Sequence, residues 1–306
     1  MSIQSLVIDD LPGGLRIPYV DVRGIEDGPH LTVIAGVHGT EYTSIAAVRE
    51  FARSLDPALV SGRITAVPLV NVPAFWARSP FVVPHDGKNL NRCFPGEPAG
   101  SYAEVLAHHL TEAFIANTHY LIDVHAGDLP EALEPFVMYE ESPVEGAARD
   151  LALAYGLGHL VRQSAASRTV AGSTCAAAAD LGVPGIVAEA GQNGLMDRAS
   201  VKRHLKGLTN VARHVGVLPG VPELQAPPQE HEGWHWLRTH SAGWWEPAVP
   251  VGAEVKAGAL LGTVSELLGG VLQEVRAPEA GVLLFLTTSP AVEADGLLLG
   301  LARSRR

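Results

Sequence analysis

Sulfur and long apolar segments are scarce in this chain. Only two of its 306 residues are cysteine, Cys93 and Cys175, which excludes a disulfide framework or a cluster of thiolate metal ligands and is typical of a reducing compartment. Apolar stretches such as residues 31–37 fall far short of the roughly 20 residues that a membrane span requires. Residues 1–10 have neither the basic start nor the apolar run of a signal peptide. These absences predict a cytoplasmic protein without a membrane partner.

Positive charge is also scarce. The chain has 22 lysines and arginines against 33 aspartates and glutamates, a net charge of −11, which repels nucleic acid and anionic membranes. The one cationic cluster, Arg303, Arg305 and Arg306, is interpreted as a solvated tail. The sequence also contains no Gly-Xaa-Ser-Xaa-Gly elbow, which weighs against a serine hydrolase. Residues 36–39 lack the spacing and the lysine of a P-loop.

What the chain does have is a globular composition, with 47% hydrophobic and 18% charged residues. A chain of this length can bury roughly three quarters of the surface that it exposes when unfolded. Short apolar runs at residues 31–37, 64–70, 120–124 and 185–188 alternate with amphipathic helical patterns at 43–55, at 102–117, from 142 to either Gly156 or Gly158, and at 198–215. Such alternation predicts an α/β fold, with a mostly parallel or mixed central sheet and flanking helices.

The pattern changes after residue 217. We expect a catalytic domain over residues 1–217, a proline-rich linker over 218–233 and a small all-β, barrel-like domain over 234–306. Residues 255–262 and 292–300 form a weak internal repeat, which is typical of a pseudo-symmetric barrel. The tryptophans of this region are interpreted as its core rather than as a ligand site; they are Trp234, Trp236, Trp244 and Trp245.

Three side chains at the ends of predicted strands have the identity and spacing of a metal site. His38 and Glu41 follow the first apolar run, and His125 follows the third. The carboxyl ends of parallel strands meet at one edge of a sheet, and two imidazoles with one carboxylate make a catalytic zinc site with an open position for water. Asp123 could orient the imidazole of His125 without itself binding the metal. Each residue alone also has a structural interpretation, such as a turn histidine or a satisfied buried carboxylate.

Two further segments supply candidate catalytic and binding groups. Glu189 follows the apolar run at 185–188 and could act as a general base and acid. Asn91 and Arg92 lie in a loop-like segment, and the planar guanidinium fork of Arg92 suits a carboxylate. A charge in a loop and a surface loop held by its own hydrogen bonds are the structural alternatives.

Taken together and in order, these motifs resemble the succinylglutamate desuccinylase and aspartoacylase family, a branch of the zinc carboxypeptidase fold. The resemblance covers residues 30–216 and implies a hydrolase with one Zn²⁺ per chain that cleaves the amide of a small N-acyl amino acid, with an acyl group of acetyl or succinyl type. It also implies roles for six residues: His38, Glu41 and His125 as zinc ligands, Glu189 as general base and acid, and Asn91 with Arg92 as the carboxylate clamp.

The sequence departs from the family at one position. Relatives tend to have an arginine that polarises the scissile carbonyl where this chain has Pro80, and Arg78 is the candidate to replace it. The C-terminal region is similar to biotinyl and lipoyl carrier domains, but residues 265–270 contain no lysine to modify, so we expect an unmodified module. A metallocarboxypeptidase acting on peptides and a zinc-binding protein without catalysis are the alternative functions. Whether the chain forms a homo-oligomer stays open.

Overall fold

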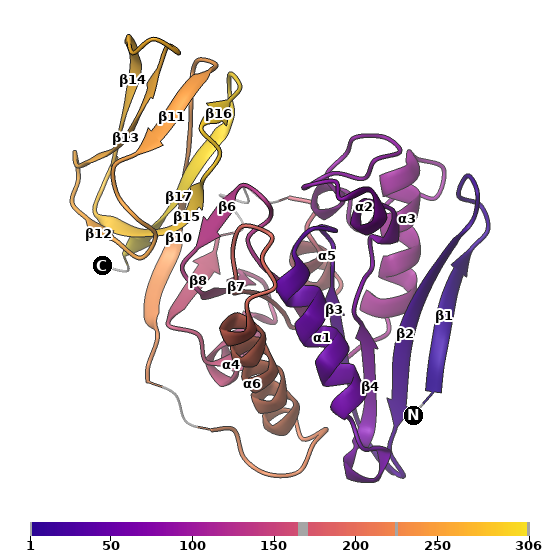
Figure 1. The fold of residues 1–306 in the computed structure, drawn as a ribbon. Coiled ribbons are helices and arrows are strands. Elements are labelled where there is room, and N and C mark those ends of the chain that lie inside the picture. The colour runs from indigo at the N-terminus through magenta and orange to yellow at the C-terminus, as the bar shows by residue number, and fades with distance from the viewer. Residues whose placement is uncertain (1, 165–170, 224–225, 305–306) are drawn as a thin grey trace.

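The computed structural model describes residues 2–164, 171–223 and 226–304, and Figure 1 shows their arrangement. The strands are β1 (Ser2–Ile8), β2 (Leu15–Arg23), β3 (Glu26–Ala35), β4 (Ser61–Val67), β5 (Tyr120–His125), β6 (Glu131–Leu133), β7 (Phe136–Glu140), β8 (His159–Gln163), β9 (Gly185–Glu189), β10 (Gln229–Arg238), β11 (Gly243–Pro247), β12 (Glu254–Val255), β13 (Leu260–Ser265), β14 (Val271–Arg276), β15 (Gly281–Thr287), β16 (Ala291–Val292) and β17 (Leu297–Ser304). The α-helices are α1 (Tyr42–Ser54), α2 (Val72–Ala77), α3 (Tyr102–Leu110), α4 (Glu145–Tyr155), α5 (Thr174–Asp180) and α6 (Arg198–His214).

The central sheet is mixed, which confirms the predicted fold class. Within the described residues its path is β1-β2-β4-β3-β5-β9-β7-β8-β10-β17-β15-β12. The middle strands β4, β3, β5 and β9 are parallel to one another, whereas β7 is antiparallel to β9. The four apolar runs that predicted strands form these parallel strands, because residues buried on both faces of a sheet are apolar at successive positions.

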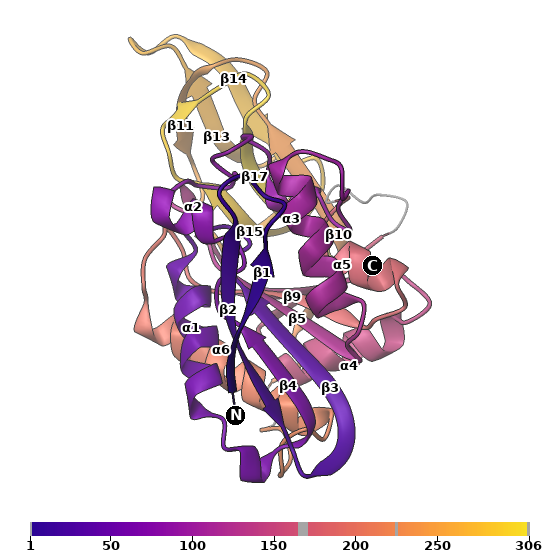
Figure 2. The same cartoon turned by 90° about the vertical axis from the view of Figure 1, so that its right-hand side faces the viewer.

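Helices cover both faces of this sheet (Figure 2). Alternate residues of β3 divide between the two sides: Val33 packs with α1, α4 and α6 in one cluster, and Ile34 packs with α3 and α5 in the other. The predicted helices at 43–55 and 198–215 correspond to α1 and α6 within one residue. The helix expected from residue 142 begins later, at Glu145, because Ser142 and Pro143 form a turn before it, and it ends as expected at Gly156 in the left-handed conformation.

The C-terminal strands continue the central sheet. Strand β10 pairs in parallel with β8 and antiparallel with β17, while β14, β13, β11 and β16 form a separate antiparallel sheet. Residues 229–233, which we expected in the linker, are therefore the first part of β10, because their backbone hydrogen bonds go to β8. Residues 224–225 of that linker and Arg305 and Arg306 of the tail lie outside the described residues. The division of the chain into two domains stays a prediction.

The weak repeat corresponds to two similar structural units. Residues 255–262 join β12 to β13, and residues 292–300 join β16 to β17. Each connection contains a residue in the left-handed region, Gly258 with φ 79° and Asp295 with φ 61°. No described helix has both the length and the apolar character needed to cross a membrane.

Candidate active site

The candidate metal ligands lie at the carboxyl ends of two adjacent parallel strands. Strand β3 ends at Ala35 and the following turn carries His38 and Glu41 into helix α1, while His125 is the last residue of β5. The turn is tight: a Cβ on Gly39 would lie 2.2 Å from the backbone nitrogen of Phe75 in α2. Only glycine fits there, so the turn that brings His38 toward β5 depends on this residue.

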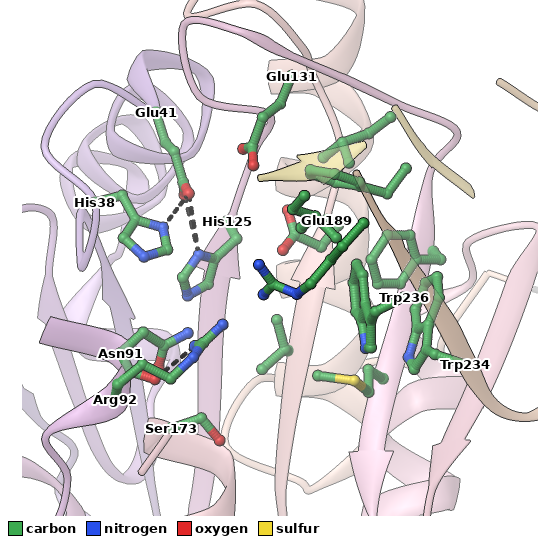
Figure 3. Close-up of a pocket in the computed structure, with 17 residues that line it drawn as sticks. His38, Glu41, Asn91, Arg92, His125, Glu131, Ser173, Glu189, Trp234 and Trp236 are labelled. Atoms are coloured by element: carbon green, nitrogen blue, oxygen red, sulfur yellow. Dashed lines mark hydrogen bonds and ion pairs between the residues drawn. The ribbon is translucent and has the colours of Figure 1, made fainter. Parts of the chain in front are cut away.

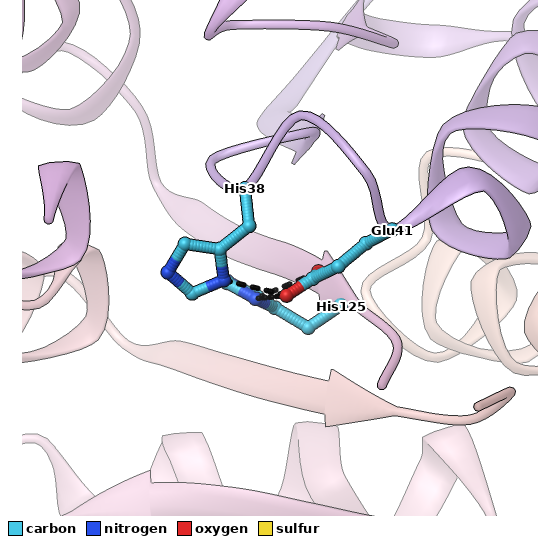
Figure 4. Close-up of side chains that lie close together, drawn as sticks. All are labelled: His38, Glu41 and His125. Carbon is cyan, nitrogen blue, oxygen red and sulfur yellow. Dashed lines mark hydrogen bonds and ion pairs between the residues drawn. The ribbon is translucent and has the colours of Figure 1, made fainter. Parts of the chain in front are cut away.

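These three side chains meet around one point (Figure 4). Their ligand atoms all lie within 4.8 Å of one another. A carboxylate oxygen of Glu41 lies 2.5 Å from Nδ1 of His38, and its second oxygen lies 3.1 Å from Nδ1 of His125. The side chains of Glu41 and His125 are 2% and 3% exposed, so this carboxylate is almost completely shielded from solvent.

The Nε2 atom of each imidazole forms a hydrogen bond on the side of the ring that faces away from Glu41. Nε2 of His125 donates to Asp123 Oδ2 at 2.9 Å, and Nε2 of His38 donates to Asn89 Oδ1 at 3.1 Å. Asn89 Oδ1 also accepts from the backbone N–H of Asn91, which identifies it as the oxygen. In the neutral tautomer both Nδ1 atoms then present a lone pair to the Glu41 carboxylate, which is repulsive unless a proton or a cation lies between them. This donor set fits a divalent metal, with outer partners that orient both imidazoles.

The charges within this cluster are strongly coupled. Burial disfavours the ionised form of Glu41, but the neighbouring His125 and His38 outweigh it and lower the pKa of Glu41 to about 2. Burial likewise disfavours the charged form of His125, but Asp123 and Glu41 raise its pKa well above the usual value. Without a metal, the cluster therefore carries a proton on an imidazole, and a metal ion would displace that proton.

Glu189 stands beside the cluster. It ends β9 and is the direct register partner of His125 on β5. Burial, together with the charges of Glu41 and Asp123, raises the pKa of Glu189 to about 8. Its Oε2 has no hydrogen-bond partner among the described residues. The carboxyl group is thus placed to take up or release a proton near neutral pH.

The expected carboxylate clamp lies in a short 3-10 helix over Leu90–Arg92. Asn91 is buried, and its Oδ1 accepts from the backbone N–H of Thr174 at the start of α5. One guanidinium nitrogen of Arg92 donates to the carbonyl of Asn91 at 2.7 Å. Several guanidinium N–H groups of Arg92 remain for a ligand, because the side chain has five donors.

One pocket of about 390 Å³ is lined by the three candidate metal ligands, by Glu189 and by the Asn91–Arg92 pair, and Figure 3 shows these side chains converging on it. Its lining is polar near the cluster and apolar on the opposite wall, which strands β10, β15 and β17 help to form. The lining residues are His38, Glu41, Asn91, Arg92, His125, Glu131, Leu133, Phe136, Met138, Ser173, Val187, Glu189, Trp234, Trp236, Arg238, Phe285 and Leu297.

Residues 27–215 match the model of the succinylglutamate desuccinylase/aspartoacylase catalytic domain. The chain belongs to this family.

Similar proteins match nearly the whole chain. The N-alpha-acetyl-L-2,4-diaminobutyric acid deacetylase of Halomonas elongata is 29% identical over 282 residues, which are 89% of this chain and 81% of that protein. The product-bound structure of the ectoine utilization protein EutE (DoeB) from Ruegeria pomeroyi is 26% identical, with a TM-score of 0.89 over 99% of this chain and 95% of that one. A succinylglutamate desuccinylase/aspartoacylase structure from Rhodobacter sphaeroides shares the fold, with a TM-score of 0.87 at 23% identity over 100% and 95% of the two chains. The family description and the name of the Halomonas elongata relative thus both denote enzymes that remove acyl groups.

Six of the seven predicted site residues of this family member line the pocket, and Arg78 does not. Arg78 ends helix α2 in the left-handed conformation, with φ 53°, and its side chain is exposed. The position of Arg78 at the end of α2, outside the pocket lining, does not support the expectation that it replaces the arginine absent at Pro80.

The interpretation of the tryptophans as core residues was right for Trp245 and Trp234, which belong to buried apolar clusters. Trp245 is 1% exposed in the C-terminal core, whereas Trp244 is 42% exposed. Trp234 and Trp236 stack on each other and line the pocket. Together with Arg238 they repeat every second residue along β10, a period that could have indicated one shared face.

Sequence reasoning also missed Glu131 and Ser173. Glu131 follows His125 by six residues, and Ser173 is the N-cap of α5. Neither lies in a motif that separates it from an ordinary polar loop residue.

Proposed function

We propose that this protein is a zinc-dependent amidohydrolase that removes an acyl group, of acetyl or succinyl type, from a small N-acyl amino acid. The observation that carries the proposal is the His38, Glu41 and His125 cluster, which opens into a pocket shared with Glu189 and Arg92. The names of the relatives, a diaminobutyric acid deacetylase among them, support this class of reaction. The cytoplasmic location stays a prediction.

In this proposal, His38, Glu41 and His125 hold one Zn²⁺. Zinc bound there would supply a Lewis acid for the amide carbonyl and a water of lowered pKa. Glu189 accepts the proton of the attacking water and returns it to the nitrogen of the leaving amine. Its unpartnered Oε2 and its raised pKa suit both transfers.

The positively charged side of the pocket would orient the substrate. The fork of Arg92 and the amide of Asn91 would bind the substrate carboxylate, so that the amide bond lies between the cluster and Glu189. Desolvation by the surrounding protein, and next the charge of Arg238, lower the pKa of Arg92. An arginine held close to a second guanidinium gains from an anionic ligand that compensates both charges.

The proposal is tested by metal removal and one substitution. A panel of N-acetyl and N-succinyl amino acids and of dipeptides is assayed before chelation, after chelation and after addition of zinc. Activity on the N-acyl amino acids should disappear with the chelator and return with zinc. Glu189→Gln should retain about one zinc per chain but lose at least about 100-fold in kcat, whereas the control Glu134→Gln, which alters a carboxylate outside the pocket, should keep full activity.

Three results would contradict parts of this proposal. Undiminished turnover by Glu189→Gln would remove Glu189 from the mechanism. Faster hydrolysis of dipeptides than of N-acyl amino acids would favour a metallocarboxypeptidase. Zinc binding without hydrolysis of any compound in the panel would favour a binding protein that lacks catalysis.

A further inference from the structure

A buried histidine contacts the chain next to the proposed general base. His204 lies on helix α6, is completely buried and is not among the residues that line the pocket. Its Nε2 lies 2.9 Å from the backbone carbonyl oxygen of Ala190, the residue that follows Glu189. Because a carbonyl oxygen can only accept a hydrogen bond, Nε2 carries the proton and donates it. His204 therefore holds the peptide group beside Glu189 from outside the pocket.

Tyr155 selects this tautomer of His204. The tyrosine hydroxyl lies 2.7 Å from Nδ1 of the imidazole. A neutral imidazole that has its proton on Nε2 accepts at Nδ1, so the hydroxyl donates to it. Burial lowers the pKa of His204 to about 4, and the ring is therefore neutral near pH 7. Both ring nitrogens thus have fixed partners, which gives the imidazole a single orientation.

The packing of two helices keeps the Tyr155 and His204 pair in place. Tyr155 is the last residue of α4, and α4 and α6 pack side by side (Figure 1). Gly207 follows His204 by three residues on α6, and a Cβ at this glycine would lie 2.4 Å from Cε1 of Tyr155. An apolar side chain in the place of His204 would fill the space without burying polar groups. The hydrogen bonds therefore specify a position that apolar packing alone does not specify.

The peptide group that His204 holds lies where the two strands of the site end. The backbone N–H of Ala190 donates to the carbonyl of His125 at 3.3 Å. His125 and Glu189 are direct register partners at the ends of β5 and β9. The carbonyl of His125 is also a second hydrogen-bonding neighbour of the His204 imidazole. One imidazole therefore contacts the backbone of a proposed metal ligand and of the residue next to the proposed base.

The position of the Glu189 carboxyl group depends on this backbone. Its Oε2 has no hydrogen-bond partner among the described residues, so no neighbouring donor fixes that oxygen. Strand β9 ends at Glu189, and the chain turns at Gly191, whose φ is 99°. The Ala190 peptide between them sets the direction in which the strand ends. A misplacement of about 1 Å at a reacting group can cost about 100-fold in rate.

We propose that His204 is a positioning residue for Glu189: it holds the carbonyl of Ala190 and so sets the place of the Glu189 carboxyl group relative to the proposed metal site. This inference rests on the proposed function, in which Glu189 is the general base and acid. It goes beyond that function because it assigns part of the catalytic geometry to a side chain on α6 that touches neither the substrate nor the metal.

The experiment removes and then restores the hydrogen-bond donor. His204→Leu fills much of the same space without a donor, and His204→Gln supplies an amide N–H instead. At saturating zinc, both are assayed with the N-acyl amino acid that wild-type protein hydrolyses fastest. His204→Leu should lose about 10- to 100-fold in kcat with KM unchanged within about twofold, and His204→Gln should stay within about threefold of wild-type kcat. The control Leu208→Ala, which truncates another completely buried residue of α6, should lose stability and keep kcat.

Two measurements test the contact without any turnover. The ¹⁵N NMR spectrum of the wild-type imidazoles should contain one ring that is protonated at Nε2 and not at Nδ1 near pH 7, and its signals should be absent in His204→Gln. Hydrogen exchange of peptides that cover residues 188–191 should be about tenfold faster in His204→Leu than in wild type, because the end of β9 is no longer held. His204→Gln should exchange at nearly the wild-type rate.

The outcomes separate this inference from the proposed function. Wild-type kcat in His204→Leu, or a loss confined to KM, would overturn the positioning role while the deacylase proposal stands. An equal loss of kcat in Leu208→Ala would assign the effect to stability and overturn it as well. A proton on Nδ1 of His204 in wild-type protein would overturn it even if His204→Leu does not fold. If wild-type protein hydrolyses no compound in the panel, the proposed function fails, whereas the NMR and exchange measurements still report whether His204 holds the end of β9.

Discussion

Asp123 offers the sharpest test of how the structure prepares the proposed metal site. This residue is completely buried in β5, and it holds Nε2 of His125 at 2.9 Å. It also accepts a hydrogen bond from the hydroxyl of Thr174. A carboxylate behind a ligating histidine fixes the ring orientation and strengthens the other nitrogen as a ligand. We therefore expect Asp123 to act on zinc affinity without contacting the metal.

The expected loss of zinc affinity follows from the hydrogen bond between Asp123 and His125 that the substitution removes. Removing such an outer partner typically costs 10- to 100-fold in metal affinity, which corresponds to about 1.4 to 2.8 kcal/mol. Asp123→Ala should approach the upper value, because it leaves the ring of His125 unsupported and the Thr174 hydroxyl without this acceptor. Asp123→Asn can still accept from Nε2, so its loss should lie near the lower value.

Zinc affinity is measured by titrating the metal-free proteins in competition with a chromophoric chelator. The matched control is Asp21→Asn, which changes another buried aspartate, in β2, whose partners are Arg63 and Arg23. That variant should lose stability and keep the affinity for zinc. Wild-type affinity in Asp123→Ala, within about twofold, would refute the reasoning that the outer partner tunes the ligand.

Two other perturbations test separate parts of the structure. Burial lowers the pKa of His204 to about 4 in the folded protein, whereas the pKa of an unfolded histidine is about 6.5. Between these two pH values the unfolded state binds more protons than the folded state. The stability of the protein therefore falls as the pH falls from 6.5 to 4. His204 alone should account for roughly 3 kcal/mol of this loss. In urea unfolding, His204→Gln should therefore lose roughly 3 kcal/mol less stability than wild type between pH 6.5 and pH 4, and an equal loss in both proteins would contradict the assignment. Arg92→Lys should raise KM for N-acyl amino acids roughly tenfold with little change in kcat, because lysine has no planar fork, whereas Arg78→Ala, outside the pocket, should leave both constants unchanged. A larger effect on KM or kcat at Arg78 than at Arg92 would contradict the placement of Arg92 in the pocket and of Arg78 outside it.

The cluster of His38, Glu41 and His125 was predictable from the sequence because its geometry depends on local features. Apolar runs buried on both faces indicated β3, β5 and β9, and parallel strands present their carboxyl ends at one edge. The spacing of His38 and Glu41 in one turn, and the position of His125 and Glu189 at the ends of strands, then placed these residues near one another.

The far wall of the pocket was not predictable in the same way. Its residues depend on β10 joining β8, and on β6 pairing with β15, which are contacts between segments far apart in the chain. A period of two along β10 shows that Trp234 and Trp236 share a face, but it does not show what that face meets. The position of Glu131 in the pocket and the exposed position of Arg78 likewise follow from the tertiary arrangement and not from the adjacent residues.

The continuation of the sheet from β8 into β10 has an evolutionary consequence. The groups that would break the amide bond come from residues 38–189, while Trp234, Trp236, Phe285 and Leu297 come from strands more than forty positions later. Mutations in those late strands can therefore change the substrate preference and leave the proposed catalytic groups unchanged. A chimera that takes its final strands from a relative should also acquire the substrate preference of that relative.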